Sequence, residues 1–260
     1  MKYLFLIFIV VGNLQAKEQW GIAVGGVSVP HYMGSAEHYQ ATVPFPFLLE
    51  NDKIFFEDEG LYSNWTSELN LPISGDDVNA TKPTGFDDEN EYPVNSKDYA
   101  RRGMGYLPPA LYLGLNLGYK LGPVTLEFSS KPGVQIGGNW GNAGVINKAS
   151  LMLYAFAVNK ADSARCLCFR YDKIYTNDTY NKLYYGVEPQ HAITDRPYYD
   201  ARTTGLLGDQ ISVTYMQRFS SISIMAYGNL QMMDKSVVKD SPLVERTENM
   251  TIALALAYMF

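Results

Sequence analysis

The sequence predicts an all-β fold: a transmembrane antiparallel up-and-down β-barrel of about ten strands, with twelve as the alternative. Alternating residues, a leader-like amino terminus and the lack of a long apolar run predict it. The alternation is clearest over residues 249–260, where every second residue is large and apolar and the last is Phe260. A period of two indicates a strand, and an apolar face suits a lipid-facing strand of a closed barrel. Taken alone, this stretch also fits a half-buried strand of a soluble sandwich.

The first sixteen residues predict export. Lys2 precedes an apolar run over residues 3–11, and a short segment then leads to Ala16. The run is shorter than the roughly 20 residues that cross a bilayer, and its order is that of a secretory signal peptide. We therefore expect residues 1–16 to be a signal peptide and residues 17–260 to form one barrel domain in the cell outer membrane.

Composition agrees with an exported β protein. Of the 260 residues, 47% are hydrophobic and 20 are tyrosines. No later run reaches the roughly 18 apolar residues of a membrane helix, so helical spanning is excluded. The net charge of −6 argues against a nucleic-acid partner, because such a partner requires a basic face.

Ten segments are predicted as strands. They are residues 20–29, 40–50, 53–74, 110–121, 124–129, 148–158, 165–175, 209–219, 222–232 and 249–260. Short turns are expected at 51–52, 121–123 and 220–221 on the periplasmic side, and long external loops at 30–39, 75–108 and 176–208, with a further one around 241–244. The 53–74 segment is interpreted as one bulged strand, because two strands there would put the next long loop on the wrong side.

The two faces of these strands have different predicted roles. Aromatic residues at periplasmic strand ends should form an interfacial girdle, and they are Trp20, Tyr119, Phe219, Tyr258 and Phe260. Of these, Tyr258 and Phe260 are also expected to serve barrel assembly and closure. Polar-face charges are expected to pair inside the lumen, and they are Lys120, Glu127, Arg170 and Asp172.

Cys166 and Cys168 stand two residues apart in a predicted strand, so both should point to one face. Their Cα atoms would be about 6.5 Å apart with nearly parallel Cβ directions, which is poor geometry for a disulfide. We expect small interior residues here, and a redox or metal role is the alternative.

Candidate catalytic and metal-binding residues are few. His31, His38 and His191 all fall in predicted external loops, and we expect surface histidines. A mouth-located nucleophile site or a metal site with Glu37 is the alternative. The acidic loop 75–108 is expected to be solvated and too polar to be buried, with divalent-cation binding as the alternative. We expect no catalytic residue, metal or cofactor.

Several short motifs resemble the MipA/OmpV family of outer-membrane proteins, named for a MltA-interacting member. They are Tyr32-Met33-Gly34-Ser35, the Pro44/Pro46 strand, Ala100-Arg101-Arg102-Gly103-Met104, Tyr184-Tyr185-Gly186-Val187, Arg196-Pro197-Tyr198-Tyr199-Asp200-Ala201-Arg202 and Ser241-Pro242-Leu243-Val244. The resemblance implies an outer-membrane barrel and, for the named member, a scaffold that links a lytic transglycosylase to a murein synthase. The acidic loop and the cysteine pair depart from the family pattern.

The expected function is that of a non-catalytic scaffold or interaction protein of the cell envelope. Its expected partners are outer-membrane lipid and lipopolysaccharide, with murein hydrolase or synthase proteins as further candidates. The alternatives are a small-solute channel, a surface adhesin, or last a lipid- or peptide-modifying barrel enzyme. A barrel of about ten strands is filled by its own side chains, whereas open pores have about 16 to 18 strands.

Overall fold

The structure is a computed structural model and describes residues 18–50, 60–74, 98–136, 141–160 and 163–259. The strands are β1 (Glu18–Pro30), β2 (His38–Glu50), β3 (Gly60–Asn70), β4 (Ile73–Ser74), β5 (Tyr106–Leu107), β6 (Ala110–Leu121), β7 (Val124–Gln135), β8 (Asn142–Lys160), β9 (Ser163–Thr176), β10 (Gly205–Phe219), β11 (Ile222–Met232) and β12 (Glu248–Met259). The helices are α1 (Asp178–Tyr185) and two 3₁₀ turns, η1 (Tyr99–Arg101) and η2 (Pro189–His191). No helix in these ranges is long and apolar enough to cross a membrane.

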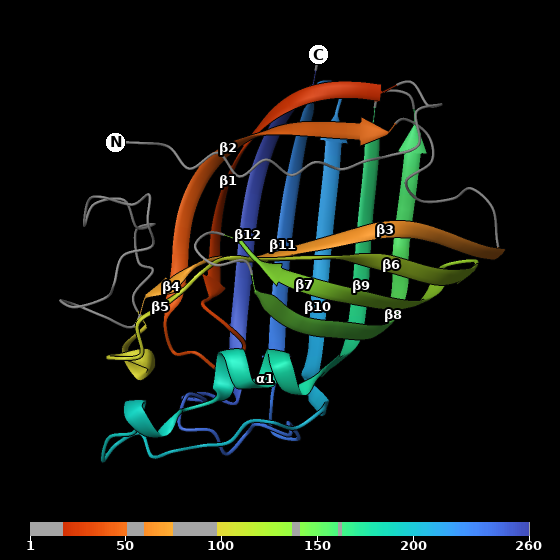
Figure 1. Ribbon diagram of the computed structural model, residues 1–260. Helices are drawn as coiled ribbons and strands as arrows, with labels where there is room; N and C mark the ends of the chain where they lie inside the picture. The colour runs from red at the N-terminus through yellow and green to blue at the C-terminus, as the bar shows by residue number, and fades with distance from the viewer. Residues whose placement is uncertain (1–17, 51–59, 75–97, 137–140, 161–162, 260) are drawn as a thin grey trace.

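Ten of the strands form one antiparallel sheet, in the order β2-β1-β12-β11-β10-β9-β8-β7-β6-β3. The sheet curls, so that β3, β6 and β7 pass in front of β10, β11 and β12 in Figure 1. The phenol of Tyr39 in β2 donates to the carbonyl of Pro72, just beyond β3. The two end strands of the order, which follow one another in the chain, therefore meet at that end.

The predicted closing pair is confirmed. β12 pairs with β1 from Gly21 opposite Met259 to Ser28 opposite Ile252. The predicted fold class, an antiparallel up-and-down barrel of ten main strands, is also confirmed, and β4 and β5 form a separate small sheet.

The outer face of the sheet is apolar and the inner face is polar or small. In β6, Leu113, Leu115 and Leu117 are 51 to 52% exposed, whereas Asn116 between them is buried. In β12, Leu254 is 61% exposed and Ala257 is buried. Soluble monomers rarely expose so continuous an apolar surface, and an apolar outside over a polar inside is the pattern of a membrane barrel.

The predicted strand bounds agree with the structure for 110–121 and 222–232, while the third strand differs. β3 begins at Gly60 and ends at Asn70, and the chain resumes as the short strand β4. Residues 51–59 lie outside the described part of the chain. The long bulged strand predicted over 53–74 is therefore wrong at its carboxyl end, where Leu71 and Pro72 separate β3 from β4. Proline lacks the N–H that a strand ladder uses.

The long loop predicted over 176–208 contains a short helix, α1. The side chain of Asn177 caps this helix by accepting from the N–H of Tyr180. Gly144 in β8 has a φ of +87°, and a Cβ at that position would lie 2.4 Å from the Tyr180 nitrogen. The missing side chain therefore lets α1 approach β8.

The two ends of the barrel differ. The turn end carries the short connections between β6 and β7 and between β10 and β11, while the loop end carries α1 and the long connections (Figure 1). The buried apolar cluster lies mainly at the loop end. Its fully buried members include Ile73, Tyr112, Ile146, Tyr184, Tyr185, Val187, Met233, Val238 and Leu243.

Candidate functional site

Four segments gather at the loop end: residues 31–37, 98–107, 177–204 and 233–247. We call them together the loop cap. Most of the motifs that carry the family resemblance lie in it, although they are spread over more than 200 residues of sequence. The loop cap is therefore the first candidate functional site.

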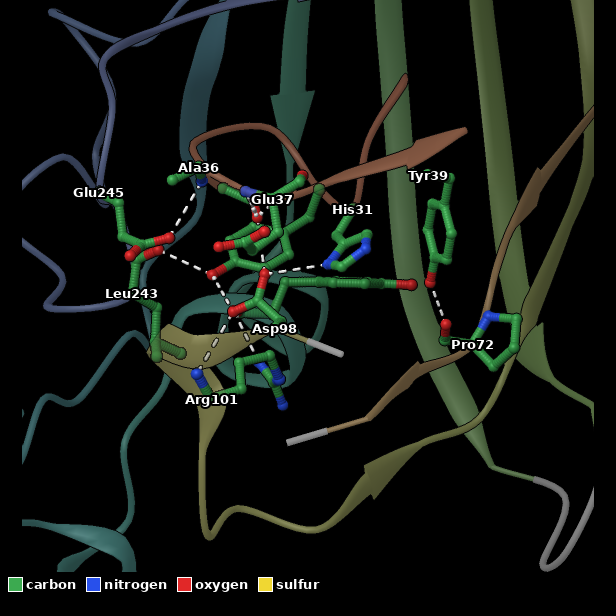
Figure 2. A network of polar contacts seen from close by, with 12 residues as sticks. His31, Ala36, Glu37, Tyr39, Pro72, Asp98, Arg101, Leu243 and Glu245 are labelled. Atoms are coloured by element: carbon green, nitrogen blue, oxygen red, sulfur yellow. Dashed lines mark hydrogen bonds and ion pairs between the residues drawn. The ribbon is translucent and has the colours of Figure 1, made fainter. Parts of the chain in front are cut away.

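Asp98 is the centre of the loop cap's polar network (Figure 2). Its Oδ2 atom accepts from the Ser35 hydroxyl at 2.6 Å and lies 3.2 Å from Nδ1 of His31. Its Oδ1 atom accepts from the backbone N–H of Arg101 at 3.3 Å. Burial by itself would raise the pKa of this carboxyl, but the bonds from His31 and Ser35 and the charge of Arg101 outweigh it and lower the pKa below its usual range.

The geometry of Ser35, His31 and Asp98 fits a structural anchor. The Ser35 hydroxyl donates directly to the carboxylate, and its oxygen accepts from the N–H of Glu37 at 3.0 Å. An activated nucleophile needs a base poised to take its proton, and a carboxylate with a lowered pKa is a poor proton acceptor. The arrangement fixes the 31–37 loop against the 98–107 segment.

Hydroxyl groups join the segments by bonding to backbone carbonyls. Tyr32 donates to the carbonyl of Leu243 at 2.8 Å, and Tyr185 donates to that of Met33 at 2.8 Å. Ser241 in turn donates to the carbonyl of Tyr185 at 2.7 Å. These bonds hold together three segments that are far apart in the sequence. Because the bonded groups are buried, they take these partners in place of bulk water.

Arg101 of the 98–107 segment and Arg196 of the 177–204 segment also bind backbone carbonyls of other segments. Arg101 donates from Nη1 to the carbonyl of Tyr184 at 3.0 Å. Arg196 donates to the carbonyls of Ala100 at 2.9 Å and Arg102 at 2.6 Å. Burial, together with the nearby Arg101 and Arg102, lowers the pKa of Arg196. Both buried guanidinium groups bind backbone carbonyls, so they hold the two segments together.

The last strand also contributes. The side chain of Asn249 accepts from the N–H of Gly34 at 2.7 Å and donates to the carbonyl of Ser35 at 2.6 Å. Gly34 has a φ of +102°, and a Cβ there would lie 3.0 Å from the Met233 sulfur. Glycine is the residue that takes this conformation without strain.

The outer side of the loop cap has an open hollow of about 510 Å³. Charged side chains from two segments line it, among them Arg101, Lys182, Glu188 and Arg202, together with the imidazole of His191. Lys182 and Glu188 form an ion pair at 3.3 Å on its rim. A ligand that approaches from outside the barrel would meet both charges and apolar side chains in this hollow.

The barrel interior is the second candidate site. Its cavity of about 610 Å³ contains two ion-pair groups. Arg170 lies 3.3 Å from Glu127 and 2.7 Å from Asp172. Glu68 lies 2.5 Å from Lys131 and 2.9 Å from Lys148. Each of these charges therefore has an opposite charge within contact.

Of the four predicted lumen charges, the structure brings Glu127, Arg170 and Asp172 together. Lys120 lies on the same face of β6 as Asn116, but nearer the turn end. Among the described residues, it does not line the cavity. Sequence reasoning missed Glu68, Lys131 and Lys148. The period of two could have found Lys131, because it continues the inward-facing series of Thr125, Glu127 and Ser129 along β7.

The structure places the aromatic residues as follows. Tyr119, Phe219 and Tyr258 are 50%, 52% and 53% exposed, and all lie near the turn end. Trp20 lies in β1 and pairs with Leu48 of β2. Phe260 lies outside the described residues.

Two expectations for the loops are wrong. His31 is buried and bound to Asp98, because the folded loop cap encloses it. The 98–107 end of the acidic loop is not simply solvated, since Asp98 and Arg101 are only 2% and 4% exposed. Each found partners in other loops, which spacing within one loop could not reveal. The acidic residues between 76 and 91 lie outside the described part.

His38 and His191 are partly exposed. Both cysteines are free, and both line the interior cavity.

Comparison with known proteins gives a family and a distant structural likeness. None of the curated proteins matches this chain. Among solved structures, LpxR from Salmonella typhimurium matches with a TM-score of 0.35 and 8% identity, over 92% of this chain and 100% of that one. The family described as "MltA-interacting protein MipA" matches residues 22–260. Since this match spans nearly the whole chain, the protein belongs to the MipA family.

Proposed function

We propose that this protein is an outer-membrane β-barrel that serves as a non-catalytic scaffold of the cell envelope. The observation that supports the proposal is the contrast between an apolar outer face and a lumen lined with paired charges. An aqueous pore or a reaction site would need free polar groups facing open space. Here the lumenal charges neutralise one another.

The membrane location is tested by fractionation and by gel migration. We expect the protein in the outer-membrane fraction, with slower migration after boiling than before it, because a closed barrel resists unfolding by detergent. Recovery from the soluble periplasm without such a shift would overturn the location.

The non-catalytic role is supported by the loop cap, where Asp98 holds the Ser35 hydroxyl. We expect no turnover of lipid or peptide substrates by the purified barrel. Turnover that disappears in His31→Ala or His191→Ala would show an enzyme instead. Because His31 is buried against Asp98, the His191→Ala variant is the cleaner test.

The family description names MltA as the interacting protein of its named member. We extend this to a partner that hydrolyses or builds murein, bound at the turn end, which would face the periplasm. Crosslinking in intact envelopes followed by purification of the barrel should recover such enzymes. Substituting turn residues such as the exposed Ser220 and the half-buried Ser221 should lower their recovery, while changes in the loop cap should not.

A second candidate function is binding at the cell surface, as an adhesin or ligand receptor. The open hollow favours it, because the loop cap presents charged groups from two segments there. Paired substitutions Lys182→Ala and Arg202→Ala should reduce attachment of a surface ligand without altering envelope crosslinks. The opposite pattern would favour the murein scaffold.

A channel is the least supported alternative, and it has a direct test. Large and charged side chains narrow the cavity from its walls, among them Glu68, Tyr154 and Arg170. We expect little or no conductance in planar bilayers. Large steady single-channel currents would overturn this expectation.

A further inference from the structure

Sulfur side chains form a row across three neighbouring strands on the inner face of the barrel. Cys166 of β9 is the direct partner of Met216 of β10, and Met216 is the direct partner of Met225 of β11. Direct partners in an antiparallel pair have Cβ atoms about 4.5 to 5.5 Å apart on the same face. The three sulfur-bearing side chains are therefore immediate neighbours.

A fourth sulfur belongs to the same surface. Cys168 follows Cys166 by two residues in β9 and so shares its face. All four residues line the 610 Å³ cavity, together with Met152. The Met152 sulfur, however, accepts from Nη1 of Arg170 at 3.5 Å, so it is engaged by a cation and is left out of the set.

Space remains in front of the row. The next partners along it are Ala255 of β12 and Gly25 of β1. Both are too small to fill the lumen at this level. Flexible methionine side chains can move into such a space, because they have three rotatable bonds.

The chemistry of these four groups selects a soft ion. Thiolate and thioether ligands favour Cu(I), whereas carboxylate and carbonyl ligands suit hard cations. Within the described residues, no group of three or more His, Cys, Asp and Glu side chains is placed to hold a metal ion. The two cysteines are free, and their spacing on one strand disfavours a disulfide that would consume them.

We infer that Cys166, Cys168, Met216 and Met225 form a binding site for a soft monovalent metal ion, Cu(I) or Ag(I), on the inner wall of the barrel. Each thiol that binds as a thiolate releases one proton to solvent, so binding should strengthen as pH rises. The thioethers bind without losing a proton. The site lies nearer the turn end than the ion pairs of Glu68, so it does not require their disruption.

The test is titration of the purified, folded barrel in detergent with Ag(I), which avoids the redox chemistry of copper. We expect one tightly bound ion per chain. Cys166→Ser with Cys168→Ser should abolish tight binding. Met216→Leu with Met225→Leu should weaken it by at least about tenfold, because even loss of a group that only supports a metal ligand typically costs about 10- to 100-fold in affinity. X-ray absorption at the silver edge should show more than two sulfur neighbours in the wild type.

Met250→Leu is the matched control, because Met250 lies on β12 but is 55% exposed on the outer face. Leucine conserves volume closely enough that folding should persist, and heat-dependent gel migration checks this for every variant. Three results would overturn the inference. They are absence of tight binding in the wild type, unchanged affinity in the double leucine variant, and equal weakening by Met250→Leu.

Discussion

The lumen and the loop cap are both polar interiors, but they are built differently. The lumen is held largely by charge pairs between strands, such as Arg170 of β9 with Glu127 of β7. The loop cap is held mostly by neutral side chains and arginines that bind backbone carbonyls, as Tyr185 does with Met33. Charge pairs between regular strands fill a space, whereas bonds to carbonyls fix the path of irregular chain. The ion pairs thus line the interior cavity, and the loop cap makes a surface.

The largest effect should follow loss of a lumenal charge. Glu68→Ala leaves Lys131 and Lys148 without their shared carboxylate, and their side chains are only 5% and 17% exposed. We expect the free energy of unfolding to fall by about 3 kcal/mol, because removing one partner of a buried pair leaves uncompensated charge. Thermal unfolding in detergent, followed by gel migration, measures it.

The control for this prediction replaces the whole group. Glu68→Leu with Lys131→Met and Lys148→Met removes all three charges together, and should recover most of the loss. If the triple variant is as unstable as Glu68→Ala, packing rather than charge accounts for the effect.

Loss of the loop cap's anchor should act locally. Asp98→Ala removes the acceptor of Ser35, His31 and the N–H of Arg101, and we expect it to destabilise the loop cap by about 2 kcal/mol. Limited proteolysis of intact cells should cut the loop cap faster while the barrel keeps its heat-dependent migration. Asp195→Ala is the control, since Asp195 is 80% exposed and pairs only with Arg102 among the contacts described. Simultaneous collapse of the barrel would show that the two regions are not separate.

The same carboxyl predicts a response to acid. Its pKa in the folded state is lowered by His31 and Ser35 despite burial, so its stabilising contribution is complete above the usual value of about 3.9 and is lost as pH falls through the lower folded value. The near-ultraviolet circular dichroism of the loop cap tyrosines should be constant from neutral pH to about pH 5 and decline below about pH 3.9. Asp98→Asn should remove this acid step, and an unchanged step in that variant would assign it to another group.

A smaller effect is expected from a single phenol. Tyr185→Phe removes the bond to the carbonyl of Met33 and leaves the ring in place. The expected cost is about 1 kcal/mol, visible as modestly faster proteolysis of the loop cap. Tyr198→Phe is the comparison, because Tyr198 is 55% exposed. Equal effects in the two variants would argue against the carbonyl bond as the cause.

The smallest effect is expected on the rim of the hollow. Glu188→Ala breaks the pair with Lys182, whose side chain is 44% exposed. Exposed pairs contribute about 0.5 kcal/mol or less, so loop cap stability should hardly change. A loss comparable to that of Asp98→Ala would mean that the hollow is part of the loop cap's framework.

The regular part of the fold could be predicted from the sequence because its signal is local. In β6, alternation of Leu113, Leu115 and Leu117 with small or polar residues specifies both strand and faces, and the structure agrees. The lumenal partners of Arg170 followed from the same period. The capping residue Asn177 is a local signal for the start of α1, which the prediction of a loop over 176–208 did not use.

The loop cap could not be predicted in this way, because its determinants are contacts between distant residues. Asp98 is a buried anchor only because Ser35 and His31 arrive from another loop. Nothing periodic connects these positions. The family motifs marked the right residues, but the reason for each motif appears only when the loops are brought together.

The amide of Asn249 has a consequence for the order of folding. It joins the last strand to Gly34, a contact 215 positions apart in the sequence, and contacts of such separation form late because the intervening chain must be ordered first. The 31–37 loop leaves the ribosome early, yet it lacks this partner until β12 is in place. A complete loop cap therefore indicates that β12 is in place. In an incompletely assembled molecule, the 31–37 loop would lack its bond to Asn249.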